Sequence, residues 1–221
     1  MQQSANLPEL LYIYDAYCAW CYGMGPVLQR VEQEFAGRLT VGVLSGGMMA
    51  NAEAAPIGEA WEEMAVALRQ VEQVTGVKFR EAYRQLGQKG RYLQDSEPPA
   101  RALHVFRQLD PEGRAAAFAH AIQRALFERG EDLNAVATYE ALVQPYGLDT
   151  QEFRRQFLLP ATATTVQQEF AAVSRIGVQG FPTIILRVGT QGYVLSRGYQ
   201  PYEAFVQALE QALQQASEDN A

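Results

Sequence analysis

Two short apolar runs near the N-terminus flank a segment in which apolar residues recur at helical spacing. Residues 10–14, LLYIY, are rich in β-forming side chains and predict a buried strand. Residues 39–44, LTVGVL, predict a second strand, and Gly37 is expected to end the helix between them, over about 19–35. A connection of this length is typical of two parallel strands joined by a right-handed crossover.

The middle of the chain, 52–176, is rich in Ala, Gln, Glu and Arg and predicts five to seven short helices. Pro56 is expected in the first turn of the first helix, and Ser96 is expected to cap a later one. Asp149 and Glu152 resemble a capping box. The apolar stripes behind these predictions are Trp61, Met64, Leu68 and Val71; Leu103, Phe106 and Leu109; Phe118, Ile122 and Leu126; Leu133, Val136 and Leu142; and Phe153 and Phe157.

The C-terminal part returns to β-structure. Residues 183–188 and 192–196 predict a hairpin, and 202–214 predict a final amphipathic helix. The order βαβ, helical block, ββα predicts an α/β fold in which a large all-helical insertion splits the sheet. We therefore divide the chain into an α/β domain, residues 1–51 and 177–221, and a helical insertion domain, residues 52–176.

Composition narrows the classes of function. The 221 residues carry 25 acidic and 18 basic side chains, and this net charge of -7 without a basic cluster argues against nucleic acid as the main partner. No apolar run approaches the roughly 20 residues that a membrane span requires. The N-terminus, MQQSANLPEL, has neither a basic start nor an apolar stretch of signal-peptide type. We therefore expect a cytoplasmic protein without a membrane partner.

The only two cysteines, Cys18 and Cys21, lie between the first predicted strand and the first predicted helix. A single pair excludes a disulfide scaffold, and in a reducing compartment it is more often catalytic or metal-binding than structural. Residues three apart share a helical face, so the sulfurs can reach disulfide distance. The helix N-terminus favours a thiolate at the first cysteine. The pattern predicts a redox site in which Cys18 attacks a substrate sulfur and the more buried Cys21 resolves the mixed disulfide.

Two other interpretations of the cysteine pair stay open. The pair could be half of a zinc site, but the remaining soft ligands, His104 and His120, lie sixteen residues apart in the helical block, which is no zinc-finger spacing. The two thiols could also be inert core residues. The histidines themselves are more typical of packed or exposed helical positions than of catalytic ones.

A second motif, Gly177-Val178-Gln179-Gly180-Phe181-Pro182-Thr183, precedes the late hairpin. A proline directly before a strand cannot donate to the ladder, and the two glycines permit a sharp turn in which an X-Pro bond can be cis. A cis bond would leave the backbone of Phe181 free to pair with an extended substrate. Taken alone, the segment is better explained as a proline that begins a strand.

Together the two motifs resemble the thioredoxin superfamily, and the helical insertion resembles its DsbA-like branch. The similarity is closer to bacterial proteins described as predicted protein-disulfide isomerases, which are related to the FrnE-like group. The resemblance implies a thioredoxin-like fold with a cis Phe181–Pro182 bond facing Cys18. The residues that carry it are Tyr14, Asp15, Cys18, Trp20, Cys21, Tyr22 and Gly23, with the stretches 45–47, 95–98 and 197–199.

The resemblance also implies roles for individual residues. Cys18 would be the nucleophile and Cys21 the resolving thiol. Substrate contact would come from Phe181, Pro182 and Trp20, although Trp20 could equally pack onto the insertion. The supporting residues would be Asp15, Ala19, Gly180 and Thr183.

Three positions near the motif qualify the resemblance. Ala19 stands where many DsbA relatives carry proline, so the helix start is expected to be less rigid. Tyr12 occupies the position at which better-studied thioredoxins bury an acid in the first strand. Asp15 is the nearest acid in the sequence, and we expect it to cap the turn; the alternative role is proton acceptor for Cys21.

The sequence therefore predicts a thiol–disulfide oxidoreductase, with protein-disulfide isomerase activity as one form. Its partners would be the thiols and disulfides of proteins or peptides, with glutathione as a further candidate, and it would need no bound metal or organic cofactor. The alternatives are a non-redox, glutathione-dependent isomerase or transferase of the kappa-like type, and a non-catalytic chaperone or partner-binding module with a redox switch. Kappa-like enzymes generally carry serine at the nucleophile position, where this chain has Cys18.

Overall fold

The computed structural model describes residues 7–219, in which the predicted α/β sheet is present. The sheet has the strand order β2-β1-β5-β6. β1 pairs with β2 in parallel and with β5 in antiparallel orientation, and β5 and β6 form the predicted hairpin. The strand bounds are β1 Glu9–Tyr14, β2 Thr40–Ser45, β5 Thr183–Val188 and β6 Gln191–Arg197.

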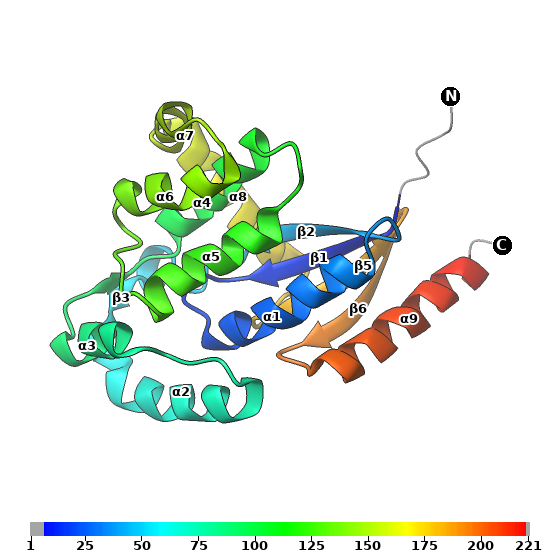
Figure 1. Cartoon of the computed structure of the whole chain (residues 1–221), viewed down its shortest axis with the longest axis horizontal. Coiled ribbons are helices and arrows are strands. Elements are labelled where there is room, and N and C mark those ends of the chain that lie inside the picture. Colours follow the sequence, from blue (N-terminus) through cyan, green and yellow to red (C-terminus); the bar gives the residue numbers. More distant parts are fainter. Residues whose placement is uncertain (1–6, 220–221) are drawn as a thin grey trace.

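Helices cover both faces of this sheet (Figure 1). The crossover helix α1 (Ala19–Glu34) and the C-terminal helix α9 (Tyr202–Asp219) share one face, where the guanidinium of Arg30 lies 3.6 Å from the ring centre of Tyr202. Helix α8 (Pro160–Arg175) packs against β2 on the other face. The predicted order of strands and helices is therefore confirmed for the sheet and its flanking helices.

Seven α-helices lie between β2 and β5 in the chain, in agreement with the predicted five to seven. In Figure 1, α2 and α3 lie on one side of the start of α1, and α4 to α7 lie on the other. Besides α8, the bounds are α2 Trp61–Thr75, α3 Glu81–Lys89, α4 Glu97–Leu109, α5 Ala115–Phe127, α6 Val136–Val143 and α7 Thr150–Phe157.

Two local predictions in this helical block need correction. Pro56 is not inside the first turn of a helix; it ends the short strand β3 (Ala55–Pro56), which pairs with β4 (Leu93–Gln94), and it directly precedes the 3-10 helix Ile57–Ala60 that leads into α2. Proline is tolerated there because a short edge strand does not need its missing donor. Ser96 precedes α4, but its backbone is helical, and its hydroxyl accepts from the Met49 N–H at 2.9 Å instead of capping the helix.

Aromatic rings join the helical block to α1. The ring of Phe127 in α5 lies 5.1 Å from Tyr22 of α1, 5.1 Å from Phe79 and 4.9 Å from Tyr83 of α3, measured between ring centres. Phe127 is fully buried. Aromatic ring pairs of this kind stabilise the fold by more than the burial of their apolar surface alone. This packing fixes the first turns of α1, which carry the cysteines, against α3 and α5.

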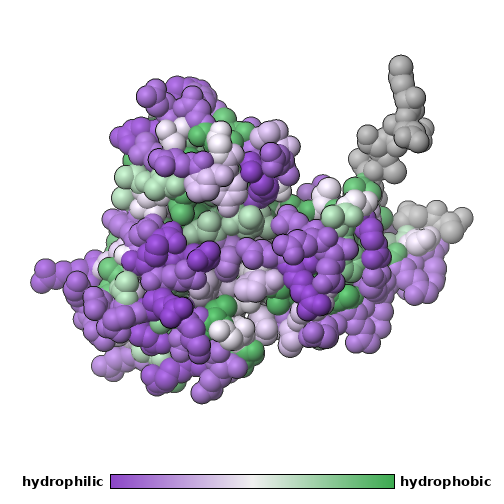
Figure 2. Space-filling model, viewed as in Figure 1, coloured by the Kyte–Doolittle hydropathy of each residue, from purple (hydrophilic) through white to green (hydrophobic). Residues whose placement is uncertain are grey.

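The outer surface is mainly polar. Figure 2 shows that apolar residues on the viewed face form small separate patches among hydrophilic side chains. Across residues 7–219, no helix combines the length and the apolar character needed to cross a bilayer.

His120 is a packed residue of the helical block, which is one of the two positions, packed or exposed, that the sequence predicted for the histidines. Its ring stacks on Tyr22 at 5.5 Å between centres, and its Nδ1 is buried without a hydrogen-bond partner. This edge of the ring lies directly against Gly25 of α1. A Cβ added to Gly25 would lie only 2.1 Å from Nδ1, so a larger residue would not fit there. Burial lowers the pKa of His120 to about 4, and the charge of Arg124 adds to this effect while Glu128 opposes it.

This depressed pKa predicts a pH-dependent stability. Between pH 6.5 and 4 the unfolded chain binds a proton at His120 that the folded protein does not bind. The stabilisation from neutral His120 is therefore complete above pH 6.5 and is lost as the pH falls towards 4, a loss of about 2–3 kcal/mol. Urea unfolding at neutral pH and near the folded pKa measures it. His120→Phe keeps the stacked ring and should lose less stability over this interval; equal losses in the two proteins would refute the assignment.

Candidate active site

The connection between β1 and α1 is a tight turn held by Asp15. Its carboxylate accepts from the Tyr17 N–H at 3.0 Å, and its backbone carbonyl accepts from the Cys18 N–H at 3.2 Å. The second carboxylate oxygen accepts from the Met48 N–H at 2.8 Å, which ties the loop after β2 to the same turn. The capping role predicted for Asp15 is thus confirmed by its hydrogen bonds.

Cys18 occupies the N-cap position of α1. Its backbone is extended, and its Sγ accepts from the Cys21 N–H at 3.3 Å. A sulfur in this position receives one of the unpaired N–H groups at the helix start and faces the positive end of the helix dipole. Cys18 is buried, with 5% of its surface exposed, and both cysteines are free thiols.

Cys21 lies one turn deeper and is fully buried. Burial raises the pKa of the Cys21 thiol well above its ordinary value, and the hydrogen bond and charge of Cys18 raise it further. The hydroxyl of Tyr12 donates to the backbone carbonyl of Cys21 at 3.1 Å, so a phenol occupies the place beside this cysteine where the resemblance would have put an acid. Cys21 therefore stays protonated at neutral pH while it is in this environment.

The second motif lies against the first. The Phe181–Pro182 peptide bond is cis, as the resemblance implied, and the carbonyl of Phe181 accepts from the Cys18 thiol with 3.4 Å between Sγ and O. Two hydrogen bonds fix this loop: Thr183 Oγ1 donates to the Gly180 carbonyl at 2.8 Å, and the Gly198 N–H donates to the Pro182 carbonyl at 2.7 Å. The structure thus brings both sequence motifs to one place.

The residues predicted to contact substrate differ in exposure. Pro182 is buried, whereas Phe181 and Trp20 are half-buried and Gly180 is exposed. The Trp20 ring lies 6.3 Å from Tyr199, between ring centres, so it packs at the edge of the site beside the segment after β6. Ala19 is the first residue of α1 and is half-buried. Phe181 packs over Gly46, where an added Cβ would lie 2.0 Å from its ring.

Sequence reasoning missed Gln123. This buried side chain of α5 donates through Nε2 to the carbonyls of Asp15, at 3.1 Å, and Cys18, at 3.3 Å. The helical block is therefore hydrogen-bonded to the turn that carries Cys18, the candidate nucleophile. The sequence did contain a signal for it: Gln123 adjoins Ile122 and lies three residues before Leu126, on the apolar stripe of α5. A glutamine in such a buried position needs polar partners, which indicates hydrogen bonds to another part of the chain.

The histidines are not part of this constellation. His120 stacks on Tyr22, and His104 lines a separate hollow between α4 and α8. Among residues 7–219, no three side chains of His, Cys, Asp or Glu are grouped so that they could hold a metal ion. What the arrangement can do is exchange a disulfide: one sulfur at a helix start, a second in reach behind it, and a peptide loop opposite.

Comparisons with known proteins agree with this geometry. The sequence model of the DSBA-like thioredoxin domain matches residues 10–210. A candidate protein disulfide isomerase from Nitrosomonas europaea has a similar structure, with a TM-score of 0.82 and 28% identity, covering 95% of this chain and 98% of the other. The cytosolic disulfide reductase DsbM from Pseudomonas aeruginosa has a TM-score of 0.78 and 28% identity, covering 93% and 98%.

DsbM has also been solved with glutathione, and that structure has a TM-score of 0.74 and 27% identity, covering 93% of this chain and 99% of the other. Among curated protein sequences, none matches the chain significantly.

The contacts of Gln123 predict its effect. Gln123→Leu removes two hydrogen bonds from the turn while filling the same space, so the free energy of unfolding should fall by about 1–2 kcal/mol. Amide hydrogen exchange in 15–22 should become faster, because the turn loses its outside anchor. The exposed Gln108 provides the control: Gln108→Leu should change neither quantity. If Gln123→Leu left exchange in this segment unaltered, Gln123 would not position the turn.

Proposed function

The chain belongs to the DsbA-like thioredoxin family of thiol–disulfide oxidoreductases, and we propose that it reduces disulfides in proteins and peptides through Cys18 and Cys21. The observation that carries the proposal is the placement of Cys18 Sγ between the Cys21 N–H and the Phe181 carbonyl. These contacts hold the sulfur at the helix start and beside the backbone of a half-buried loop, where a peptide can approach.

The reaction proceeds by two exchanges. The Cys18 thiolate attacks one sulfur of the substrate disulfide, forms a mixed disulfide, and releases the other substrate sulfur as a thiolate that takes up a proton. Cys21 then loses its proton and attacks Cys18 Sγ, which releases the second substrate thiol and leaves a Cys18–Cys21 disulfide. Two electrons have moved from the protein to the substrate.

Two molecules of glutathione can close the cycle. The first attacks the Cys18–Cys21 disulfide, and the second attacks the resulting mixed disulfide, which restores both thiols and yields oxidised glutathione. One relative favours this direction: DsbM is a cytosolic disulfide reductase, and it has also been solved with glutathione. We accordingly assign the chain to a reducing compartment, with isomerisation as a secondary activity.

The different surroundings of Cys18 and Cys21 support different roles for the two thiols. The raised pKa of Cys21 keeps it from competing for the first attack, so the mixed disulfide forms at Cys18. Substrate backbone would lie along Phe181 and Pro182, with Trp20 at the edge. Asp15, Ala19, Gly180 and Thr183 would support this geometry rather than react.

Serine variants test these roles. Cys18→Ser should lower glutathione-driven reduction of a model disulfide to the uncatalysed background, because no other thiol occupies the helix start. In the absence of glutathione, Cys21→Ser should react once with the model disulfide and then accumulate as a mixed disulfide, visible as an adduct in the intact mass. Full turnover by Cys18→Ser would exclude Cys18 as the nucleophile. Should the unaltered protein itself react only once, the chain would be a redox switch and not an enzyme.

A further inference from the structure

Positive charge is concentrated in one segment of this acidic chain. Residues 76–94 contain five basic residues and one acid, Glu81, and they include both lysines of the whole protein. The expectation that the chain lacks a basic cluster is therefore wrong for this stretch. The cations are Lys78, Arg80, Arg84, Lys89 and Arg91.

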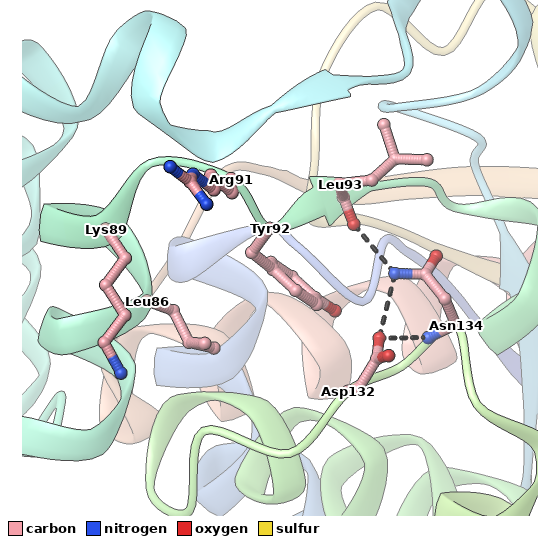
Figure 3. A pocket seen from close by; sticks show the side chains of 7 residues that line it. All are labelled: Leu86, Lys89, Arg91, Tyr92, Leu93, Asp132 and Asn134. Carbon is pink, nitrogen blue, oxygen red and sulfur yellow. Dashed lines mark hydrogen bonds between the residues drawn. The ribbon is translucent and has the colours of Figure 1, made fainter.

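A cavity of about 770 Å³ opens at the C-terminal end of α3, within this segment (Figure 3). Its size is that of a ligand pocket. Its apolar part consists of Leu86, Tyr92 and Leu93, and Leu93 is 43% exposed. In Figure 3 the Tyr92 ring lies between Leu86 and the turn formed by Asp132 and Asn134.

The polar groups opposite the cations are already engaged. Asn134 Nδ2 donates to the Leu93 carbonyl at 2.9 Å and to Asp132 Oδ1 at 2.9 Å. The same carboxylate oxygen accepts from the Asn134 N–H at 2.8 Å. Asp132 is thus turned onto its own loop, and these bonds hold the wall of the cavity in place before any ligand binds.

The two cations of the cavity have no such partners. Across residues 7–219, no carboxylate lies within ion-pairing distance of Lys89 or Arg91, whereas Arg84 of the same helix pairs with Glu72 at 3.0 Å. Uncompensated cations beside an apolar surface favour a ligand that carries carboxylates on an aliphatic or peptide body.

The cavity adjoins the turn of the candidate active site. The Tyr92 hydroxyl accepts from the Leu133 N–H at 3.1 Å and hydrogen-bonds the Tyr17 hydroxyl at 3.1 Å. Tyr17 directly precedes Cys18, and consecutive Cα atoms are about 3.8 Å apart. A tyrosine of the cavity wall therefore touches the residue next to the nucleophilic candidate.

We propose that this cavity binds an acidic segment of the protein substrate, close in sequence to the cysteine that reacts with Cys18. This inference rests on the proposed function and names its substrate class. Leu86, Tyr92 and Leu93 receive the aliphatic parts of the segment, and Lys89 and Arg91 receive its carboxylates. Because the rest of the protein is negative, an acidic substrate is repelled elsewhere and is oriented by this patch.

Binding can be measured without turnover. The probe is a short fluorescent peptide with serine in place of the reactive cysteine and glutamates beside it, compared by anisotropy with the same peptide carrying glutamines. The intact protein should bind the glutamate peptide about tenfold more tightly at low salt, and added salt should reduce this preference. Lys89→Gln with Arg91→Gln should abolish the preference.

Lys78→Gln with Arg80→Gln is the matched control, because it removes two cations near the other end of α3 that form no ion pair with any residue of the described range 7–219. This variant should keep the preference. Equal binding of both peptides to the intact protein, or a preference that survives loss of Lys89 and Arg91, would overturn the inference. Turnover of the uncharged hydroxyethyl disulfide by the intact protein reports separately on the proposed function, so failure of one claim is distinguishable from failure of the other.

Discussion

The whole arrangement depends on one sulfur being held between two segments that are far apart in the chain. Cys18 Sγ accepts from the helix N–H of Cys21 and donates to the Phe181 carbonyl, across 163 positions of sequence. The sheet makes this possible, because β1 and β5 are antiparallel neighbours in which Ile13 pairs with Thr183. The end of β1 and the beginning of β5 therefore meet at one edge, and the turn after the first faces the loop before the second.

The helical block adds what the sheet cannot provide. Gln123 binds the turn from α5, Ser96 holds the loop after β2 through Met49, and Phe127 packs on Tyr22 one residue beyond Cys21. Cys21, inside α1, is fully buried, whereas 5% of the surface of Cys18 at the N-cap is exposed. The two thiols thus differ in environment although they are three residues apart, and in the proposed mechanism this difference assigns the first attack to Cys18 and the second to Cys21.

Much of this was predictable from local sequence, and the reasons are physical. Strands β1, β2, β5 and β6 and helix α1 follow from apolar runs and spacing, and the two motifs identified both sides of the site. Helix α3 was missed because its apolar surface is small: Tyr83 and Gly87 are its buried residues. The position of Gln123 on an apolar stripe indicated a buried amide, but its partners, like the contact of Phe181 with Gly46, depend on tertiary packing that no local pattern encodes. Pro56 was predicted one position too far into the helix, because the sequence does not show that this residue also pairs with the partner strand β4.

We propose Cys18 as the reactive sulfur and Cys21 as the sheltered one. Timed alkylation of the reduced protein, with the label located by fragmentation of the peptide that holds both cysteines, distinguishes the two. We expect label at Cys18 first, with Cys21 unmodified until the protein is unfolded in denaturant. Equal labelling of the two cysteines in the folded protein, or earlier labelling of Cys21, would contradict this account of the site.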